Sequence, residues 1–274
     1  KKFVEDADAI IVRSATKMKG MLLESAKRAK VIGRAGIGVD NIDLDVATER
    51  GIVVLNTPDA NATTTAELAV AHMFSLSRNL PKADGSVRSG LWERNNFLGI
   101  ELTGKTVGVV GFGTIGRLFS EKCIGLGMNV IGFDPFVTEE TFRSYNISKV
   151  DLDELLANSD YVSLHCPVTD DTRNLINEVN LRLMKKGAHI INCARGGLID
   201  ENALLEAVED GNLAGAALDV FENEPPGDSP LFRCDKIQFT PHLGASTHEA
   251  QTAVGVEIAH NIASYLIKGQ VINA

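Results

Sequence analysis

The stretch that decides the fold of this chain is Lys105-Thr-Val-Gly-Val-Val-Gly-Phe-Gly-Thr-Ile-Gly116. Its first half predicts a short buried strand, and the residues after its last glycine carry apolar side chains at helical spacing. In the turn between them, Gly111 permits the bend, Gly113 lets a pyrophosphate approach the backbone, and Gly116 lets the helix pack on the strand. A helix that begins at such a turn offers a site for an anion.

A second predicted strand, 128–133, ends at Asp134, close to the position where a dinucleotide site places an acid. A carboxylate there accepts hydrogen bonds from the ribose hydroxyls. It would repel a 2′-phosphate, and no arginine is adjacent, so the sequence favours NAD over NADP. The alternative interpretation is an ordinary glycine-rich turn in an α/β sheet.

Composition limits the remaining possibilities. The chain has 274 residues and a net charge of −9, which fits one large or two ordinary domains and argues against nucleic acid as the main partner. No apolar run is long enough to span a membrane, no leader opens the chain, and no histidine pair has metal-ligand spacing. Four widely spaced cysteines predict reduced thiols and a cytoplasmic location, namely Cys123, Cys166, Cys193 and Cys234.

The first 57 residues alternate three apolar strands with two helices. The strands are expected at 9–13, 31–35 and 52–55, and the helices at 21–29 and 43–50. This alternation predicts a parallel sheet covered on both faces. Three strands make a thin sheet, so we expect one or two further strand–helix units to precede Lys1 in the natural protein.

From residue 106 the pattern predicts a full six-stranded dinucleotide fold. Its strands are expected at 106–110, 129–133, 161–165, 189–192, 214–218 and 237–240. Helices at 151–156 and 200–208 each start at a capping aspartate, and a closing helix at 247–268 starts at a capping box, Ser246-x-x-Glu249, and stops at Gly269. We therefore expect two doubly wound α/β domains, a Rossmann-type NAD domain (58–246) inserted in a flavodoxin-like substrate domain that is truncated at its N-terminus (1–57 and 247–274).

The helix expected at 63–78 is apolar around most of its girth, which is typical of deep burial or of a subunit interface. Pro81 is expected to mark its end. The loop that follows, 89–99, holds Trp92 and Phe97, and an exposed loop rarely presents such residues to water. The loop is therefore interpreted as a contact surface; the alternative is a small core beneath it.

Ligands of open α/β sheets bind beyond the carboxyl ends of the strands. Three reactive side chains follow consecutive predicted strands: Arg195, Glu224 and His242. A histidine can accept the proton of a hydroxyl group during hydride transfer, a carboxylate beside it fixes its tautomer, and an arginine can bind a substrate carboxylate. Taken singly, each could be an ordinary surface, turn or capped loop residue. Together they predict a dehydrogenase of 2-hydroxy acids.

The other histidines are weaker candidates for the base. His165 is a rival, but it precedes Cys166-Pro167 where the cofactor ribose should lie, so we rank it behind His242. The remaining ones lie on predicted helices or within a strand and are interpreted as structural: His72, His189, His248 and His260.

Four stretches resemble the D-isomer-specific 2-hydroxyacid dehydrogenases: Val107–Gly116, Asn192–Asp200, Ala216–Pro226 and Pro241–Thr247. The resemblance implies that Arg195 binds the substrate carboxylate, that His242 is the acid/base and that Glu224 is its partner. The residues expected to contact NAD are Gly111, Gly113, Thr114, Ile115, Gly116, Asp134, Cys166, Pro167, Cys193, Ala194, Arg195, Asp219, His242, Gly244, Ala245 and Ile37.

Three further stretches narrow the resemblance to members that act on a phosphorylated acid, namely Val12–Lys17, Val31–Asn41 and Leu91–Arg94. They imply a pocket for phosphate and carboxylate. The resemblance also implies a homodimer that uses the helix at 63–78 and the Trp92 loop, with Arg94 reaching the neighbouring subunit's pocket. The residues expected to form this pocket are Arg13, Ser14, Arg34, Gly36, Ile37 and Gly38. Two alternatives stay open: a family member specific for an unphosphorylated acid, and an NAD-sensing binding protein on the same fold, similar to a transcriptional corepressor.

Overall fold

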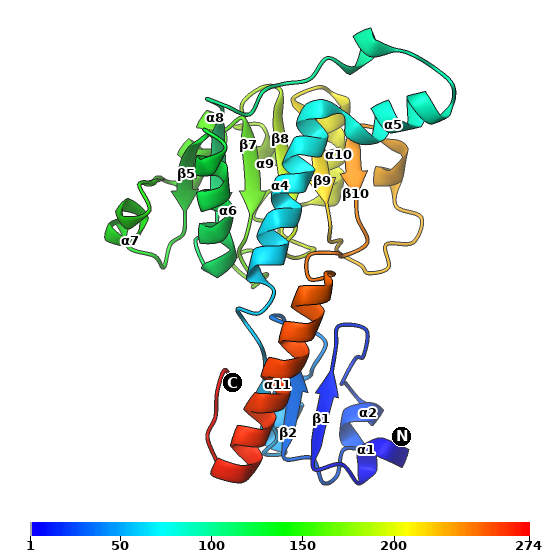
Figure 1. Cartoon of the computed structure of the whole chain (residues 1–274), viewed down its shortest axis with the longest axis vertical. Coiled ribbons are helices and arrows are strands. Elements are labelled where there is room, and N and C mark those ends of the chain that lie inside the picture. Colours follow the sequence, from blue (N-terminus) through cyan, green and yellow to red (C-terminus); the bar gives the residue numbers. More distant parts are fainter. Residues whose placement is uncertain (1) are drawn as a thin grey trace. The chain divides into compact units, whose positions relative to one another are not determined.

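The computed structural model describes residues 2–274, which form two compact units (Figure 1). One unit comprises the residues up to Thr64 together with Ala245–Ala274, and the other comprises Thr65–Gly244. Each is built on a parallel β-sheet with helices on its faces. The predicted α/β class with two parallel sheets is therefore confirmed.

The sheet of the larger unit has seven parallel strands in the order β10-β9-β8-β7-β4-β5-β6. The order reverses beside β4, so the crevice at the carboxyl ends of β4 and β7 is the expected ligand position. The strands are β4 (Thr106–Val110), β5 (Asn129–Phe133), β6 (Ser148–Lys149), β7 (Tyr161–Leu164), β8 (Ala188–Asn192), β9 (Leu213–Leu218) and β10 (Ile237–Phe239).

Helices cover both faces of this sheet, and a separate apolar core lies under each layer. Ile190 and Ile191, neighbours on β8, point into opposite cores and are both fully buried, which explains why the central strands are apolar throughout. One layer comprises α4 (Ala62–Arg78), α6 (Thr114–Gly125) and α7 (Glu139–Ser144), and the other α8 (Leu152–Asn158), α9 (Glu178–Leu181) and α10 (Glu201–Glu209).

The smaller unit has a three-stranded sheet in the order β1-β2-β3. Gly33 on β2 lets the long C-terminal helix approach, because a Cβ there would lie 2.5 Å from Ile262 Cδ1. Its elements are α1 (Lys2–Glu5), β1 (Ala9–Val12), α2 (Met21–Glu24), β2 (Val31–Arg34), α3 (Leu44–Glu49), β3 (Val53–Leu55) and α11 (His248–Lys268).

Two predicted helix ends are wrong. α11 is capped by Thr247 and not by Ser246, because the Thr247 hydroxyl accepts the Ala250 N–H at 3.1 Å. α2 ends at Glu24, five residues earlier than predicted. Arg50 donates hydrogen bonds to the carbonyl oxygens of Leu23 and Ala26, so a distant side chain holds the segment after α2 in a non-helical path.

Other differences concern short elements. Pro81 does not simply end a helix: it lies in the first turn of a further helix, α5 (Leu80–Arg88), where its missing N–H costs nothing. The predicted six strands are seven, since β6 is a two-residue strand too short for a sequence pattern. Asp151 stands at the start of α8 without a capping hydrogen bond from its side chain, whereas Asp200 does cap α10.

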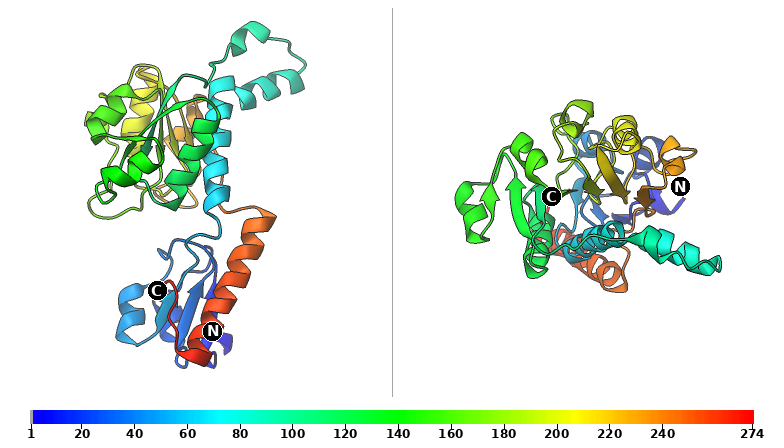
Figure 2. Two further views of the ribbon diagram at one scale, coloured as in Figure 1. Left: turned by 60° about the vertical axis from the view of Figure 1, so that its left-hand side comes forward. Right: turned by 90° about the horizontal axis from the view of Figure 1, so that it is seen from above.

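The segment after α5 extends away from the sheet of its unit (Figure 2). It includes a single 3₁₀ turn, η1 (Arg94–Phe97). Trp92 is 78% exposed, so the alternative of a small core beneath this loop is wrong for the tryptophan. Within the described residues, no helix combines the length and apolar character that a membrane span requires.

Candidate active site

The three glycines of the turn after β4 differ in how much space surrounds them. Gly111 has φ +94°, and a Cβ there would lie 2.7 Å from the backbone nitrogen of Cys166. A Cβ on Gly116 would lie 2.1 Å from the carbonyl oxygen of Gly111. Gly113 is exposed and has no atom within 4 Å of its Cβ position. The open space is therefore at Gly113, where a pyrophosphate would approach, and these residues fit NAD.

Asp134 follows β5 and is joined directly to this turn. Its Oδ2 accepts the Phe112 N–H at 2.8 Å, and its Oδ1 accepts the N–H groups of Phe136 and Val137 at 2.9 and 3.2 Å. A carboxylate has about four acceptor positions, so Oδ2 retains capacity for a ribose hydroxyl. The backbone of the turn thus orients the acid that the sequence predicts as the ribose ligand.

Alanine at Gly113 and alanine at Gly116 are expected to have different effects, the first on NAD affinity and the second on the stability of the fold. Gly113→Ala should weaken NAD binding at least about 10-fold and leave the unfolding midpoint unchanged, because φ −73° suits any residue and the Cβ occupies only the ligand's space. Gly116→Ala should lower the free energy of unfolding by about 1–3 kcal/mol through overpacking. Titration calorimetry and urea denaturation measure the two effects; equal loss of stability in both variants would contradict the assignment.

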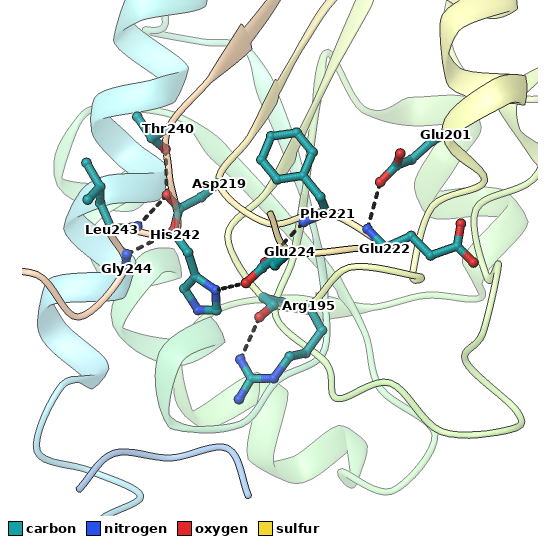
Figure 3. Close-up of polar contacts among 11 residues, drawn as sticks. Arg195, Glu201, Asp219, Phe221, Glu222, Glu224, Thr240, His242, Leu243 and Gly244 are labelled. Atoms are coloured by element: carbon teal, nitrogen blue, oxygen red, sulfur yellow. Dashed lines mark hydrogen bonds and ion pairs between the residues drawn. The ribbon is translucent and has the colours of Figure 1, made fainter. Parts of the chain in front are cut away.

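The predicted acid/base pair, His242 and Glu224, lies beyond the carboxyl ends of β10 and β9 (Figure 3). His242 Nδ1 lies 2.7 Å from Glu224 Oε2. Because a carboxylate only accepts, Nδ1 donates, and in the neutral ring Nε2 is the free acceptor. Burial alone would raise the pKa of Glu224, but hydrogen bonds from His242 and from the Phe221 N–H, with the nearby charge of Arg195, lower it. Glu224 is therefore an anion that can stabilise a protonated His242.

Arg195 follows β8 in a loop whose backbone is held by hydrogen bonds to the side chain of Asn192. Asn192 Nδ2 donates to the Arg195 carbonyl at 2.9 Å, and Asn192 Oδ1 accepts the Ala194 N–H at 3.0 Å. A Cβ on Gly196 would lie 1.7 Å from the carbonyl oxygen of Phe221, so glycine lets this loop approach the loop that carries the carboxylate. The structure thus brings Arg195 beside the histidine–glutamate pair (Figure 3).

Asp219, one of the predicted cofactor contacts, directly follows β9. Its side chain is fully buried and accepts three hydrogen bonds, from Thr240 Oγ1, Leu243 N and Gly244 N. Asp219 therefore orders the His242 loop, and its contact with the cofactor stays a prediction. Gly244 is also buried, and both of its backbone polar groups have partners, since its carbonyl accepts from Thr65.

Four further predicted cofactor residues follow β7 and β8, the two strands that come next after β4 in the sheet order. Cys166 and Pro167 follow β7, and Cys193 and Ala194 follow β8. Burial raises the pKa of the Cys166 thiol to about 11 and that of Cys193 well above its ordinary value. Both thiols therefore stay protonated at neutral pH and act as small packing groups beside the site.

His165 lies inside the larger unit. Its ring packs on Phe119 with centroids 4.8 Å apart, and its Nε2 lies 2.9 Å from Ser163 Oγ. Burial of the ring lowers its pKa from 6.5 to about 3. A ring that stays neutral at neutral pH is a poor proton acceptor, which supports ranking His165 behind His242.

The same burial predicts acid sensitivity. The folded protein keeps His165 neutral, whereas the unfolded chain protonates it near pH 6.5. The free energy of unfolding should therefore fall as the pH decreases from 6.5 toward 3, by up to about 1.4 kcal/mol per pH unit for this group. Urea denaturation at neutral pH and at about pH 5 should show a smaller decrease in His165→Asn, which retains the other buried histidines; an identical decrease would contradict the prediction.

The residues predicted to bind the substrate gather in the smaller unit. Arg13 and Ser14 follow β1, Arg34 ends β2, and Gly36, Ile37 and Gly38 come next. Since β1 and β2 are parallel, these residues share one edge of the sheet.

Three side chains that sequence reasoning missed hold the loops at this edge. Asn41 Nδ2 donates to the carbonyls of Arg13 and Thr16, and Asn56 Nδ2 donates to that of Ile37. Thr57 Oγ1 accepts the Gly36 N–H at 2.8 Å. Asn56 and Thr57, directly after β3, were a signal available in the sequence.

The family follows from this geometry and from comparison. Residues 70–244 match the family model described as D-isomer specific 2-hydroxyacid dehydrogenase, NAD binding domain. The chain belongs to that family and carries its NAD-binding domain. Among curated proteins, it is 49% identical to the D-3-phosphoglycerate dehydrogenase of Methanocaldococcus jannaschii over 96% of this chain, and 44% identical to that of Sus scrofa over 97%. The chain spans about half the length of each.

Solved structures with the same fold are named as enzymes that act on related acids. A glyoxylate reductase from Paecilomyes thermophila superimposes with a TM-score of 0.90 at 36% identity, over 99% of this chain and 84% of the other. A D-lactate dehydrogenase from Aquifex aeolicus, solved with NAD and lactic acid, gives 0.88 at 30% identity, over 100% and 89%. These similarities confirm the predicted family, the fold and NAD as the cofactor.

Proposed function

We propose that this protein oxidises D-3-phosphoglycerate to 3-phosphohydroxypyruvate with NAD, the entry step of serine synthesis. The single observation that carries the reaction type is the His242–Glu224 contact of 2.7 Å next to Arg195, in the unit that holds the glycine turn. The names of its curated relatives support the choice of acid. We also propose a cytoplasmic location.

The residues divide the chemistry among them. His242 Nε2 accepts the proton of the substrate hydroxyl, and Glu224 stabilises the imidazolium that forms. Arg195 binds the carboxylate that 2-hydroxy acids share and thereby sets the orientation of the reacting carbon. NAD, held at Gly113 and Asp134, supplies the hydride acceptor when bound.

The smaller unit supplies the selectivity in this proposal. Arg13 and Arg34 lie at the same edge of its sheet, and guanidinium groups bind phosphate with two parallel hydrogen bonds. The loop after Gly36 adds the backbone N–H groups of Ile37 and Gly38, a typical partner of anions; the Gly36 N–H is already donated to Thr57 Oγ1. Two copies are proposed to associate through α4 and the exposed Trp92 loop, with Arg94 extending toward the partner.

Arg34 should discriminate between substrates. Arg34→Gln is expected to lower kcat/KM for D-3-phosphoglycerate by about 10- to 150-fold, which corresponds to one charge-assisted contact. The value for D-glycerate, which has no phosphate, should change less than about threefold. Steady-state kinetics with both acids tests this, and equal losses would remove Arg34 from the phosphate site.

The function itself is tested by NADH formation. The protein is assayed in turn with D-3-phosphoglycerate, D-glycerate and D-lactate. Turnover of the phosphorylated acid alone would support the proposal. Turnover only of an unphosphorylated acid would keep the mechanism and reject Arg13 and Arg34 as a phosphate site, and NAD binding without turnover would favour the binding-protein alternative.

A further inference from the structure

Three polar side chains behind the His242 loop form a continuous hydrogen-bonded chain inside the larger unit. His72 lies in the middle of α4, Thr240 follows β10 and Asp219 follows β9. His72 Nε2 is 3.0 Å from Thr240 Oγ1, which is 2.5 Å from Asp219 Oδ1. His72 is 5% exposed and Asp219 is fully buried, while Thr240 between them is half-buried. The two ends lie inside the protein, where hydrogen bonds are stronger than in water.

The direction of each hydrogen bond follows from what each group can donate. The Asp219 carboxylate only accepts, so the single hydroxyl proton of Thr240 is directed to Asp219. Thr240 Oγ1 is then the acceptor for His72, which must carry its proton on Nε2. Burial lowers the pKa of His72, against the charge of Asp219, which favours the neutral ring with one N–H. The two hydrogen bonds therefore point in the same direction: His72 donates to Thr240, and Thr240 donates to Asp219.

Asp219 is in turn hydrogen-bonded to the backbone of the turn that contains His242. Its Oδ1 and Oδ2 accept the N–H groups of Leu243 and Gly244 at 2.7 and 2.8 Å, and its carbonyl accepts the His242 N–H at 2.9 Å. His242 has φ +54°, a left-handed backbone conformation that residues other than glycine adopt only rarely. Such a conformation persists only where its surroundings hold it in place.

We infer that His72 is a positioning residue for the proposed dehydrogenase reaction. Through Thr240 and Asp219 it holds the left-handed turn at His242 and so fixes the direction of His242 Nε2. This inference rests on the proposed function for its catalytic consequence. The competing interpretation is that His72 merely fills space beneath α4.

Two variants of similar size separate these interpretations. His72→Gln places an amide N–H close to the position of Nε2, whereas His72→Leu removes the donor. We expect His72→Leu to lower kcat about 10- to 100-fold, as a displaced catalytic group does, with KM for NAD unchanged. His72→Gln should recover most of kcat. If His72 only fills space, both variants lose similar stability and each folded enzyme keeps its kcat; that result overturns the inference.

A second measurement needs no activity. In protein labelled with ¹⁵N at histidine, wild-type His72 should show the Nε2-protonated neutral ring. The His242 ring signals should shift in His72→Leu and stay near their wild-type positions in His72→Gln. Unchanged His242 signals in His72→Leu would overturn the inference even if no acid is turned over, whereas absent turnover with the expected shifts would reject only the proposed function.

The route through Thr240 has its own control. Thr240→Val removes the middle hydroxyl, so adding His72→Leu to that background should produce no further shift at His242. Residues of one network give such non-additive effects. A full additional shift in the double variant would show that His72 acts by another route and would overturn the assigned network.

Discussion

Replacing His242 with alanine is expected to lower the turnover of the 2-hydroxy acid by about 10²- to 10⁴-fold, the usual contribution of a positioned general base. The loss follows because Nε2 is the free acceptor of a ring whose Nδ1 is engaged by Glu224 at 2.7 Å. NAD affinity should hardly change, since the glycine turn and Asp134 follow β4 and β5 and keep their contacts. Pre-steady-state and steady-state NADH formation, together with titration of NAD, measure both quantities.

A second histidine outside the proposed site serves as the control for His242→Ala. His248, in the first turn of α11, is exposed, so His248→Ala controls for the loss of an imidazole elsewhere in the chain. It should retain full activity. Glu224→Gln should fall between the wild type and His242→Ala, because its amide keeps a hydrogen-bonding oxygen but loses the charge that stabilises the imidazolium. A nearly normal rate in His242→Ala would refute the base assignment.

Replacing Arg195 with glutamine should lower kcat/KM by about 10²- to 10³-fold, as expected when one partner of a desolvated charge pair is removed. The substrate carboxylate would then lie in the site without a cation, and the amide can supply at most part of the bidentate contact. Because every 2-hydroxy acid has this carboxylate, the fold loss should be similar for D-3-phosphoglycerate and D-glycerate. This uniform loss distinguishes Arg195 from Arg34.

The control for Arg195 is an arginine with an exposed partner. Arg182 pairs with Glu178 on the surface of the same unit, and exposed pairs contribute little. Arg182→Gln should keep its activity on both acids. A loss in Arg195→Gln that is confined to the phosphorylated acid would move the carboxylate contact to another residue.

The larger sheet could be predicted in detail because its signals are local. β4 and β5 have the bounds that the apolar runs predict, Thr106–Val110 and Asn129–Phe133. A search of the residues just past each strand found Arg195, Glu224 and His242, which the structure brings together. The search works because parallel strands end at one edge of a sheet, so residues distant in the sequence meet there.

Sequence alone determined this protein's class, its dinucleotide turn and the set of reactive side chains, because strand period, glycine spacing and strand ends are read from neighbouring residues. Only the tertiary structure decided the burial of Asp219 and its bonds to the His242 turn, and the partnership of His72 with Thr240, 168 positions away. It also decided where α2 ends, since Arg50 binds carbonyls more than 20 residues earlier. A hydrogen bond between distant residues depends on how whole elements pack, and no local pattern encodes it.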